Sequence, residues 1–459
     1  MKRSLLRAAG DRKGSVTVFI MIFFVVLAFA IMVFLQAARE TASRGAGEKL
    51  GRLWCVSVLA EYDRNLKNKY DLFGFYGSAL SAEDRLDRYA RETFRSSGTF
   101  TGYEGVSCSL SGYSLRDTKE FHLQVVSAGK AEAARKGVET VTGKGGKDTE
   151  KQDPDRDVDA AGKQHIGSPE LLMQDLPSGG SARSVTLGGL KRVFSGARTL
   201  PGLANSGVNA AARMKYIEVH YRDLLNQAES GKTYFHCEKE YLIAGKRSDA
   251  ENKRAVRRRI VAVREVMNYL YLVKDEAKSA AALSVAELIN PAAAPAIQQA
   301  ILASWALVEA ENDYQLLIHG EKVPFVKDDT SWAVSLERIF QGGMPSAEGK
   351  QGTESVESSG EKKNDEEEPE LTEMKKRVPY IDPGNDSGNT YLDYLKALIF
   401  LSDRDVVLLR MMDLIQINMK YTCYRDFEIR DYHTGLDATF RIGRQELKIR
   451  RRYEPAGGV

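Results

Sequence analysis

Side chains that could bind a metal ion stand together at one place, where His236, Cys237 and Glu238 are consecutive. Imidazole, thiolate and carboxylate are all ligands of zinc. Adjacent residues rarely face one ion, however, because in a strand the middle side chain points to the opposite face. We therefore interpret the triplet as a half-buried strand edge. The six histidines share no metal-ligand spacing and the HExxH motif is absent, so we expect no metal site.

Motifs for other chemistry are equally weak. The segment 137–144, GVETVTGK, resembles a phosphate-binding loop but has one residue too many between its glycines. Gly145 also stands where a serine or threonine would hold magnesium. No GxSxG nucleophile motif occurs. We expect no catalytic residue and no cofactor, and the chain is not expected to be an enzyme.

A basic stretch offers a different kind of chemistry. It contains Arg254, Arg257, Arg258 and Arg259, and it extends from Lys246 to Arg264. On one helix face these cations could bind an acidic cell-wall polymer, anionic lipid or nucleic acid. The competing interpretation is a solvated helix face whose other side is packed. The overall net charge of +3 identifies no partner, because it is the remainder of 66 basic and 63 acidic residues.

The element that must position the whole chain is an apolar run from Val16 to Leu35, which includes Phe19 and Leu27 and has Thr17 as its one polar residue. A helix of this length spans about 30 Å, the thickness of a bilayer's hydrocarbon core. Five basic residues and one acid precede it, so we expect a cytoplasmic N-terminus, a single pass through the cell membrane and an extracytoplasmic body. With the body outside the cell, nucleic acid is not an expected partner. A secretory signal peptide cleaved near Ala38 is the alternative, although its apolar stretch would be shorter.

Four cysteines, Cys55, Cys108, Cys237 and Cys423, lie far apart, and no CxxC motif occurs. Outside the membrane they could form one or two disulfides. They could equally stay as buried free thiols, and the sequence leaves both alternatives open.

Composition divides the chain into segments. Residues 129–180 and 342–376 are poor in large apolar side chains, and the second segment is strongly acidic, so both are expected to be linkers or inserted loops. The expected order is a basic leader (1–14), a membrane helix (15–36), a helix with a small β region (37–128), a flexible linker (129–180), a helical domain (181–341), an acidic linker or inserted loop (342–376), and a C-terminal helix with a β-hairpin that packs on the helical domain (377–459).

Periodicity predicts an α+β fold in which helices dominate. The membrane helix is expected to continue outward, with interruptions at Gly45, Gly47 and Gly51. Two strands are expected between residues 106 and 126, the second at Phe121–Val125. Further expected elements are helices at 211–228, from Ser248 or Asp249 onward, at 274–289, at 295–311 and at 391–419 with a possible break at Ser402–Asp403, a loop at 322–332, and a hairpin of 427–429 with 436–442.

The start of the chain resembles a prepilin, and this resemblance implies a pilin-like extended N-terminal helix. A short basic leader ends at Gly14, and Ser15 opens the apolar helix with the sequence GSVTVF. A glycine before the helix is what the prepilin peptidase recognises, so the resemblance implies processing between Gly14 and Ser15. The run is similar to the opening of TadE- and TadG-like proteins of tight-adherence (Tad, or Flp) pili. Pilins and TadE-type proteins carry glutamate where this chain has Phe19, so the resemblance leans to TadG.

Longer segments resemble uncharacterised Tad-locus-associated proteins of Gram-positive bacteria. They are residues 60–74, 240–268, 322–336 and 391–419. The resemblance implies a non-enzymatic, membrane-anchored component of a type IV pilus or related secretion system. Because Phe19 replaces the glutamate that serves subunit registry, we expect a minor pseudopilin or assembly factor whose partners are membrane lipid and other pilus subunits. The alternative is a membrane-tethered surface adhesin or wall-binding module.

Overall fold

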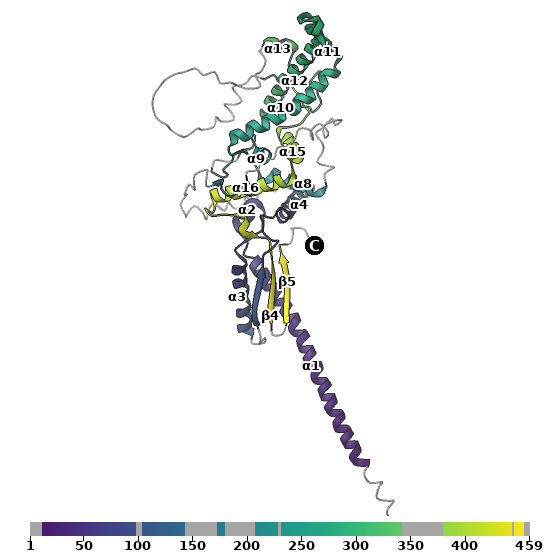
Figure 1. The fold of residues 1–459 in the computed structure, drawn as a ribbon, viewed down its shortest axis with the longest axis vertical. Coiled ribbons are helices and arrows are strands. Elements are labelled where there is room, and N and C mark those ends of the chain that lie inside the picture. The colour runs from purple at the N-terminus through teal and green to yellow at the C-terminus, as the bar shows by residue number, and fades with distance from the viewer. Residues whose placement is uncertain are drawn as a thin grey trace, which may run out of the picture. The chain divides into compact units, whose positions relative to one another are not determined.

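The computed structural model describes residues 12–97, 103–142, 172–179, 207–227, 231–341, 380–442 and 445–453. It confirms a helix-dominated α+β protein with small antiparallel sheets and one long apolar helix near its N-terminus (Figure 1). The chain forms two compact units. Of the described residues, unit 1 contains those within 12–63, 73–115 and 430–453, and unit 2 contains those within 64–72 and 116–429.

Unit 1 combines one long helix with an antiparallel sheet. Helix α1 (Arg12–Leu59) is 48 residues long, and the second half of this helix packs against the sheet. The other elements of this unit are α3 (Ala79–Ser97), β1 (Phe75–Tyr76), β2 (Tyr103–Ser109), β3 (Tyr432–His433), β4 (Gly435–Ile442) and β5 (Gln445–Arg452). The three-stranded sheet has the order β2-β4-β5, and β1 pairs with β3 in a separate two-stranded sheet.

The glycines of α1 do not interrupt it, and that prediction was wrong. A Cβ atom on Gly47 would lie 2.7 Å from Leu447 Cδ1, and one on Gly51 would overlap Ile449. These two glycines therefore let the helix backbone approach the sheet closely. Gly45 is exposed and has no atom within 4 Å of such a Cβ, so it makes no comparable contact.

The expected C-terminal hairpin is also corrected. Residues 427–429 form no strand, and Ile429–Asp431 is a short 3₁₀ helix, η3. Strand β4 pairs instead with β5 on one side and with β2 on the other, so the hairpin belongs to unit 1 rather than to the helical domain. Leu447 and Ile449 alternate with charged residues in β5, and the charges hid this strand from the sequence prediction.

The strand expected at Phe121–Val125 is a helix. Phe121, Val125 and Val126 are buried on one face of α4 (Thr118–Thr142), while Leu123 is 46% exposed. That spacing fits a helical period, whereas an alternating strand pattern would bury Leu123 on the same face as Phe121 and Val125. The expected linker 129–180 therefore begins inside α4, and its residues 143–171 lie outside the described part.

Unit 2 is built from helices. Two predictions are confirmed: Ser248 caps α10 by accepting a hydrogen bond from the Glu251 amide, and the helical region 391–419 breaks at Ser402 and Asp403. The 322–332 segment is largely a loop as expected, while α8 ends at His220, short of the predicted 228.

Besides α4, the helices described in unit 2 are α2 (Arg64–Tyr70), α8 (Val208–His220), α9 (Glu238–Ala244), α10 (Asp249–Lys274), α11 (Glu276–Ile289), α12 (Ala294–Ile318), α13 (Leu336–Gln341), α15 (Tyr391–Leu401) and α16 (Arg404–Thr422).

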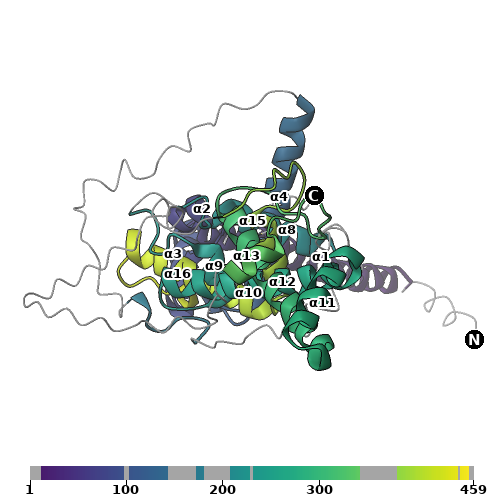
Figure 2. The ribbon, with the colours of Figure 1, turned by 90° about the horizontal axis from the view of Figure 1, so that it is seen from above.

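Helices α10 and α12 lie side by side, as both views show (Figures 1 and 2). Small side chains permit the close packing of α11 on this pair, because Ala282, Ala286 and Ala306 are fully buried. Trp305 fills the space beside them and donates its indole N–H to the Val334 carbonyl at 2.8 Å. The expected acidic segment 342–376 lies outside the described residues.

Candidate membrane anchor and buried charge network

Between Val18 and Leu35, the large apolar side chains of α1 are exposed. Phe19 is 71% and Leu35 62% exposed, and Leu27 between them is also exposed. Among the described residues, α1 alone is long and apolar enough to cross a membrane. Exposed apolar surface of this extent is unfavourable in water and favourable in lipid. The helix therefore fits a single-pass membrane anchor.

The predicted processing site lies at the beginning of the same helix. Gly14, Ser15 and Val16 belong to the first turns of α1. The apolar run follows without a break in the helix, so the junction and the membrane span form one continuous element.

The second half of α1 is held in the core of unit 1. Trp54 packs on Phe440 with ring centroids 5.2 Å apart, and its indole N–H donates to Thr93 Oγ1 at 3.0 Å. Cys55 and Val58 are fully buried in the same cluster. Burial raises the pKa of the Cys55 thiol to about 12. All four cysteines are free thiols in the structure, but only Cys55 and Cys237 are buried, while Cys108 and Cys423 are partly exposed.

The four candidate polyanion contacts do not form one free surface. Arg257 forms an ion pair with Glu311 at 2.8 Å, and Arg259 donates to the Ile243 carbonyl at 2.6 Å. Arg254 and Arg258 are exposed one turn apart on α10, where Arg258 Nε donates to the Arg254 carbonyl. Of the four, Arg254 and Arg258 therefore present exposed guanidinium groups that no side-chain carboxylate holds in the part of the chain that the structure describes.

Arg264, at the end of the basic stretch, is fully buried instead of exposed. Its Nε atom lies 2.9 Å from Asp313 Oδ2, and its Nη1 donates to the carbonyls of Pro324 and Phe325 at 2.9 Å each. Its Nη2 donates to Asn268 at 3.0 Å. All the donor nitrogens of this guanidinium are thereby engaged by groups of unit 2.

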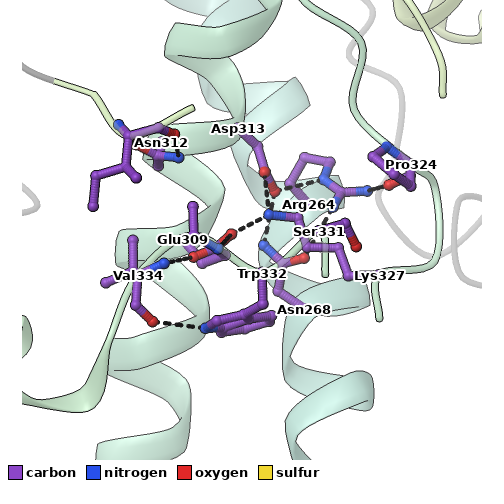
Figure 3. Close-up of polar contacts among 12 residues, drawn as sticks. Arg264, Asn268, Glu309, Asn312, Asp313, Pro324, Lys327, Ser331, Trp332 and Val334 are labelled. Carbon is purple, nitrogen blue, oxygen red and sulfur yellow. Dashed lines mark hydrogen bonds and ion pairs between the residues drawn. The ribbon is translucent and has the colours of Figure 1, made fainter. Parts of the chain in front are cut away.

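Lys327 completes the buried network from the neighbouring loop. Figure 3 shows its ammonium group directed at Asp313 and Glu309 together. The nitrogen lies 2.6 Å from Asp313 Oδ1, and Glu309 also accepts hydrogen bonds from the amides of Ala333 and Val334. Two cations and two carboxylates therefore share one water-excluded site, which fastens the loop to α10 and α12. We call Arg264, Glu309, Asp313 and Lys327 the charge network.

The two carboxylates of the charge network differ in acidity. Burial would raise the pKa of Asp313, but Arg264 and Lys327 outweigh it and hold that pKa below its usual value. For Glu309 burial prevails over the attraction of Lys327, and the nearby Asp313 charge adds to it, so the pKa is raised. The sequence reasoning missed this network. Its signal was present, because Arg264 follows Ile260 by four residues and therefore shares the buried face of α10.

A second group of buried polar residues surrounds α9. Glu238 accepts hydrogen bonds from the Arg222 amide at 2.9 Å and from Asn418 at 2.7 Å. Glu240 accepts from the Tyr391 hydroxyl at 2.8 Å and the Leu224 amide at 3.0 Å. Burial is the main reason that the pKa of each glutamate is raised to about 7.

The His236–Glu238 triplet belongs to this region and is not a strand edge. Cys237 is the N-cap residue of α9, so the triplet lies at a helix start. His236 pairs with Asp249, and Glu238 is directed into the buried hydrogen bonds described above. Within the part of the chain that the structure describes, no three histidine, cysteine or acidic residues are placed to hold a metal ion.

Comparison with known proteins gives one match. The sequence model of a family described as "Family of unknown function (DUF5702)" matches residues 160–443. No curated protein matches the chain, and no solved structure does.

Proposed function

We propose that this chain, which belongs to the DUF5702 family of unknown function, is a membrane-anchored, non-enzymatic component of a Tad/Flp-type IV pilus or a related secretion system. It would act as a minor pseudopilin or an assembly factor, with its N-terminus in the cytoplasm and its body at the cell surface of a Gram-positive bacterium. Its partners would be membrane lipid and other pilus subunits.

One observation carries the proposal, namely the division of α1 into two halves. The first half is apolar and exposed, and the second half packs on an antiparallel sheet through Gly47 and Gly51. A pilin-like subunit requires such a helix, because one part must reside in lipid or among neighbouring helices while the other stays folded with the body. The prepilin-like junction at Gly14 and Ser15 adds support from the sequence.

The first test identifies the mature N-terminus by mass spectrometry of membrane and sheared-surface fractions. A start at Ser15 supports a processed pseudopilin, and an intact Met1 supports a permanently anchored assembly factor. A start near Thr41 would mean that the apolar helix is removed and that the anchor interpretation is wrong.

A second test addresses the system itself. Deletion of the gene should abolish or shorten surface filaments, and re-expression should restore them. A Gly14→Ala variant should accumulate uncleaved in the membrane if the junction is processed. Normal filaments in the deletion strain, or filaments that consist mainly of this chain, would contradict the proposed role.

A second candidate, a wall-binding module, is favoured by one observation. Arg254 and Arg258 leave two exposed cations near each other on α10, whereas Arg257 is engaged by Glu311. Under this alternative, the double variant Arg254→Ala/Arg258→Ala loses retention on acidic wall polymer while filaments still assemble. The matched control Arg257→Ala should retain binding, because that guanidinium is already paired within the protein.

A further inference from the structure

We propose that one end of the unit 1 sheet lies on the phospholipid headgroups of the membrane that α1 crosses, with Arg441 as a contact for lipid phosphate. This is the end at which β4 finishes, at Ile442, and β5 begins, at Gln445, and we call it the β4–β5 end. The inference rests on the anchoring of α1 in the proposed function, but it does not depend on a pilus. It concerns one compact unit, in which the helix and the sheet share a core.

The level of the headgroups along α1 follows from helix geometry. The apolar run ends at Leu35, and Glu40 lies five residues further along the same unbroken helix. At 1.5 Å per residue this is a rise of about 7.5 Å. The headgroup layer on each side of a bilayer is about 5–8 Å thick, so Glu40 lies at its outer boundary.

The sheet reaches down to this level. Gln445, the first residue of β5, lies with Nε2 3.5 Å from the Glu40 carbonyl oxygen. Further along the helix, Gly47 lies close to Leu447, which is two residues after Gln445 in β5, and to Ile442, the last residue of β4. Only about five residues of α1 therefore separate the end of the apolar run at Leu35 from the first contact with the sheet at Glu40. So short a helical segment keeps the sheet close to the membrane surface.

The side chains at this end suit a headgroup surface. Arg441 and Glu446 are exposed and face each other across the β4–β5 ladder. Arg39, one residue before Glu40, is also exposed. Guanidinium groups bind phosphate through paired hydrogen bonds, so Arg441 is positioned to contact the phosphates that the geometry brings near it.

The opposite end of the sheet provides an internal reference. Ser109 of β2 pairs with Asp437 of β4, five residues from Ile442. Five strand residues span about 17 Å, so the exposed Ser111 that follows β2 lies far above the headgroups if the β4–β5 end rests on them.

Photocrosslinking of the full chain in lipid vesicles tests the placement. Benzoylphenylalanine replaces Gln36, Glu446 or Ser111 in three separate variants, which are reconstituted in vesicles of phosphatidylcholine and phosphatidylglycerol. We expect lipid adducts at 36 and 446 and none at 111. Replacing Arg441 by serine should reduce the adduct at 446 in vesicles that contain phosphatidylglycerol, and should leave the adduct at 36 unchanged.

The outcomes separate two failures. An adduct at 36 without one at 446, or equal adducts at 446 and 111, overturns the seating of the sheet while the anchor stands. No adduct at 36 means that α1 does not cross the bilayer, and the proposed function fails with it. An adduct at 446 that is unaffected by Arg441→Ser keeps the seating but removes Arg441 as its phosphate contact.

Discussion

Replacing Lys327 by alanine should strongly destabilise unit 2. The substitution leaves Glu309 and Asp313 with Arg264 as their one cation, in a site where all four side chains are fully buried. Removing one partner of a buried pair typically costs about 3–5 kcal/mol, because the remaining charge is neither solvated nor paired. We therefore expect Lys327→Ala to lower the free energy of unfolding by about this amount.

A charge-balanced double variant isolates the electrostatic part of that loss. Lys327→Met with Glu309→Gln removes one cation and one anion while keeping side chains of similar length. The double variant should lose less free energy of unfolding than the single variants Lys327→Met and Glu309→Gln lose together. The difference should be about 0.5–3 kcal/mol, the usual range of coupling between contacting residues.

Denaturant unfolding followed by tryptophan fluorescence is a suitable assay. Trp305 and Trp332 lie beside the charge network, and Trp332 has the Lys327 nitrogen 5.5 Å from its ring centre. The full chain in detergent should show the loss in the transition that these tryptophans report. A cost below about 1 kcal/mol for Lys327→Ala would refute the reasoning, because exposed pairs are worth no more than that.

Three further predictions concern other parts of the chain. Gly51→Ala should destabilise unit 1 in thermal unfolding, because overpacking against Ile449 costs about 1–3 kcal/mol, whereas the exposed control Gly45→Ala should be neutral or stabilising. Glu240 has a raised pKa in the folded state, so its contribution to stability is full below pH 4.5 and is lost as pH rises through about 7; Glu240→Gln should flatten urea-unfolding stability between those values. Cys55 has its pKa raised to about 12, so iodoacetamide at pH 8 should alkylate it in urea but hardly at all in the native protein, as peptide mass spectrometry would show.

Local signals explain what the sequence could predict. The span to Leu35 is an uninterrupted apolar run, Ser248 is a helix-capping residue before a periodic stretch, and Ser402–Asp403 places a second cap in the middle of a helical pattern. Each of these features is decided by a few neighbouring residues. Local chemistry was therefore sufficient to find them.

Non-local contacts explain what was missed. Strand β2 pairs with β4, although more than three hundred positions separate Val106 from Phe440. Gly51 looks like a helix breaker until Ile449 is placed against it, and Arg264 looks like a surface cation until Asp313 is placed beside it. In each case the residue type is explained by a partner that local periodicity does not identify.

The continuity of α1 has a mechanical consequence for the proposed function. The helix runs without a break from the apolar segment to Gly47 and Gly51, where it packs closely against the sheet. A continuous helix transmits axial displacement, because bending it sharply requires a proline, a bulge or an inserted group. Under the proposed role, moving the span out of the bilayer would therefore lift the whole of unit 1 with it. The lipid contact inferred at Arg441 would have to break in the same step, so anchoring and release would be coupled through one helix.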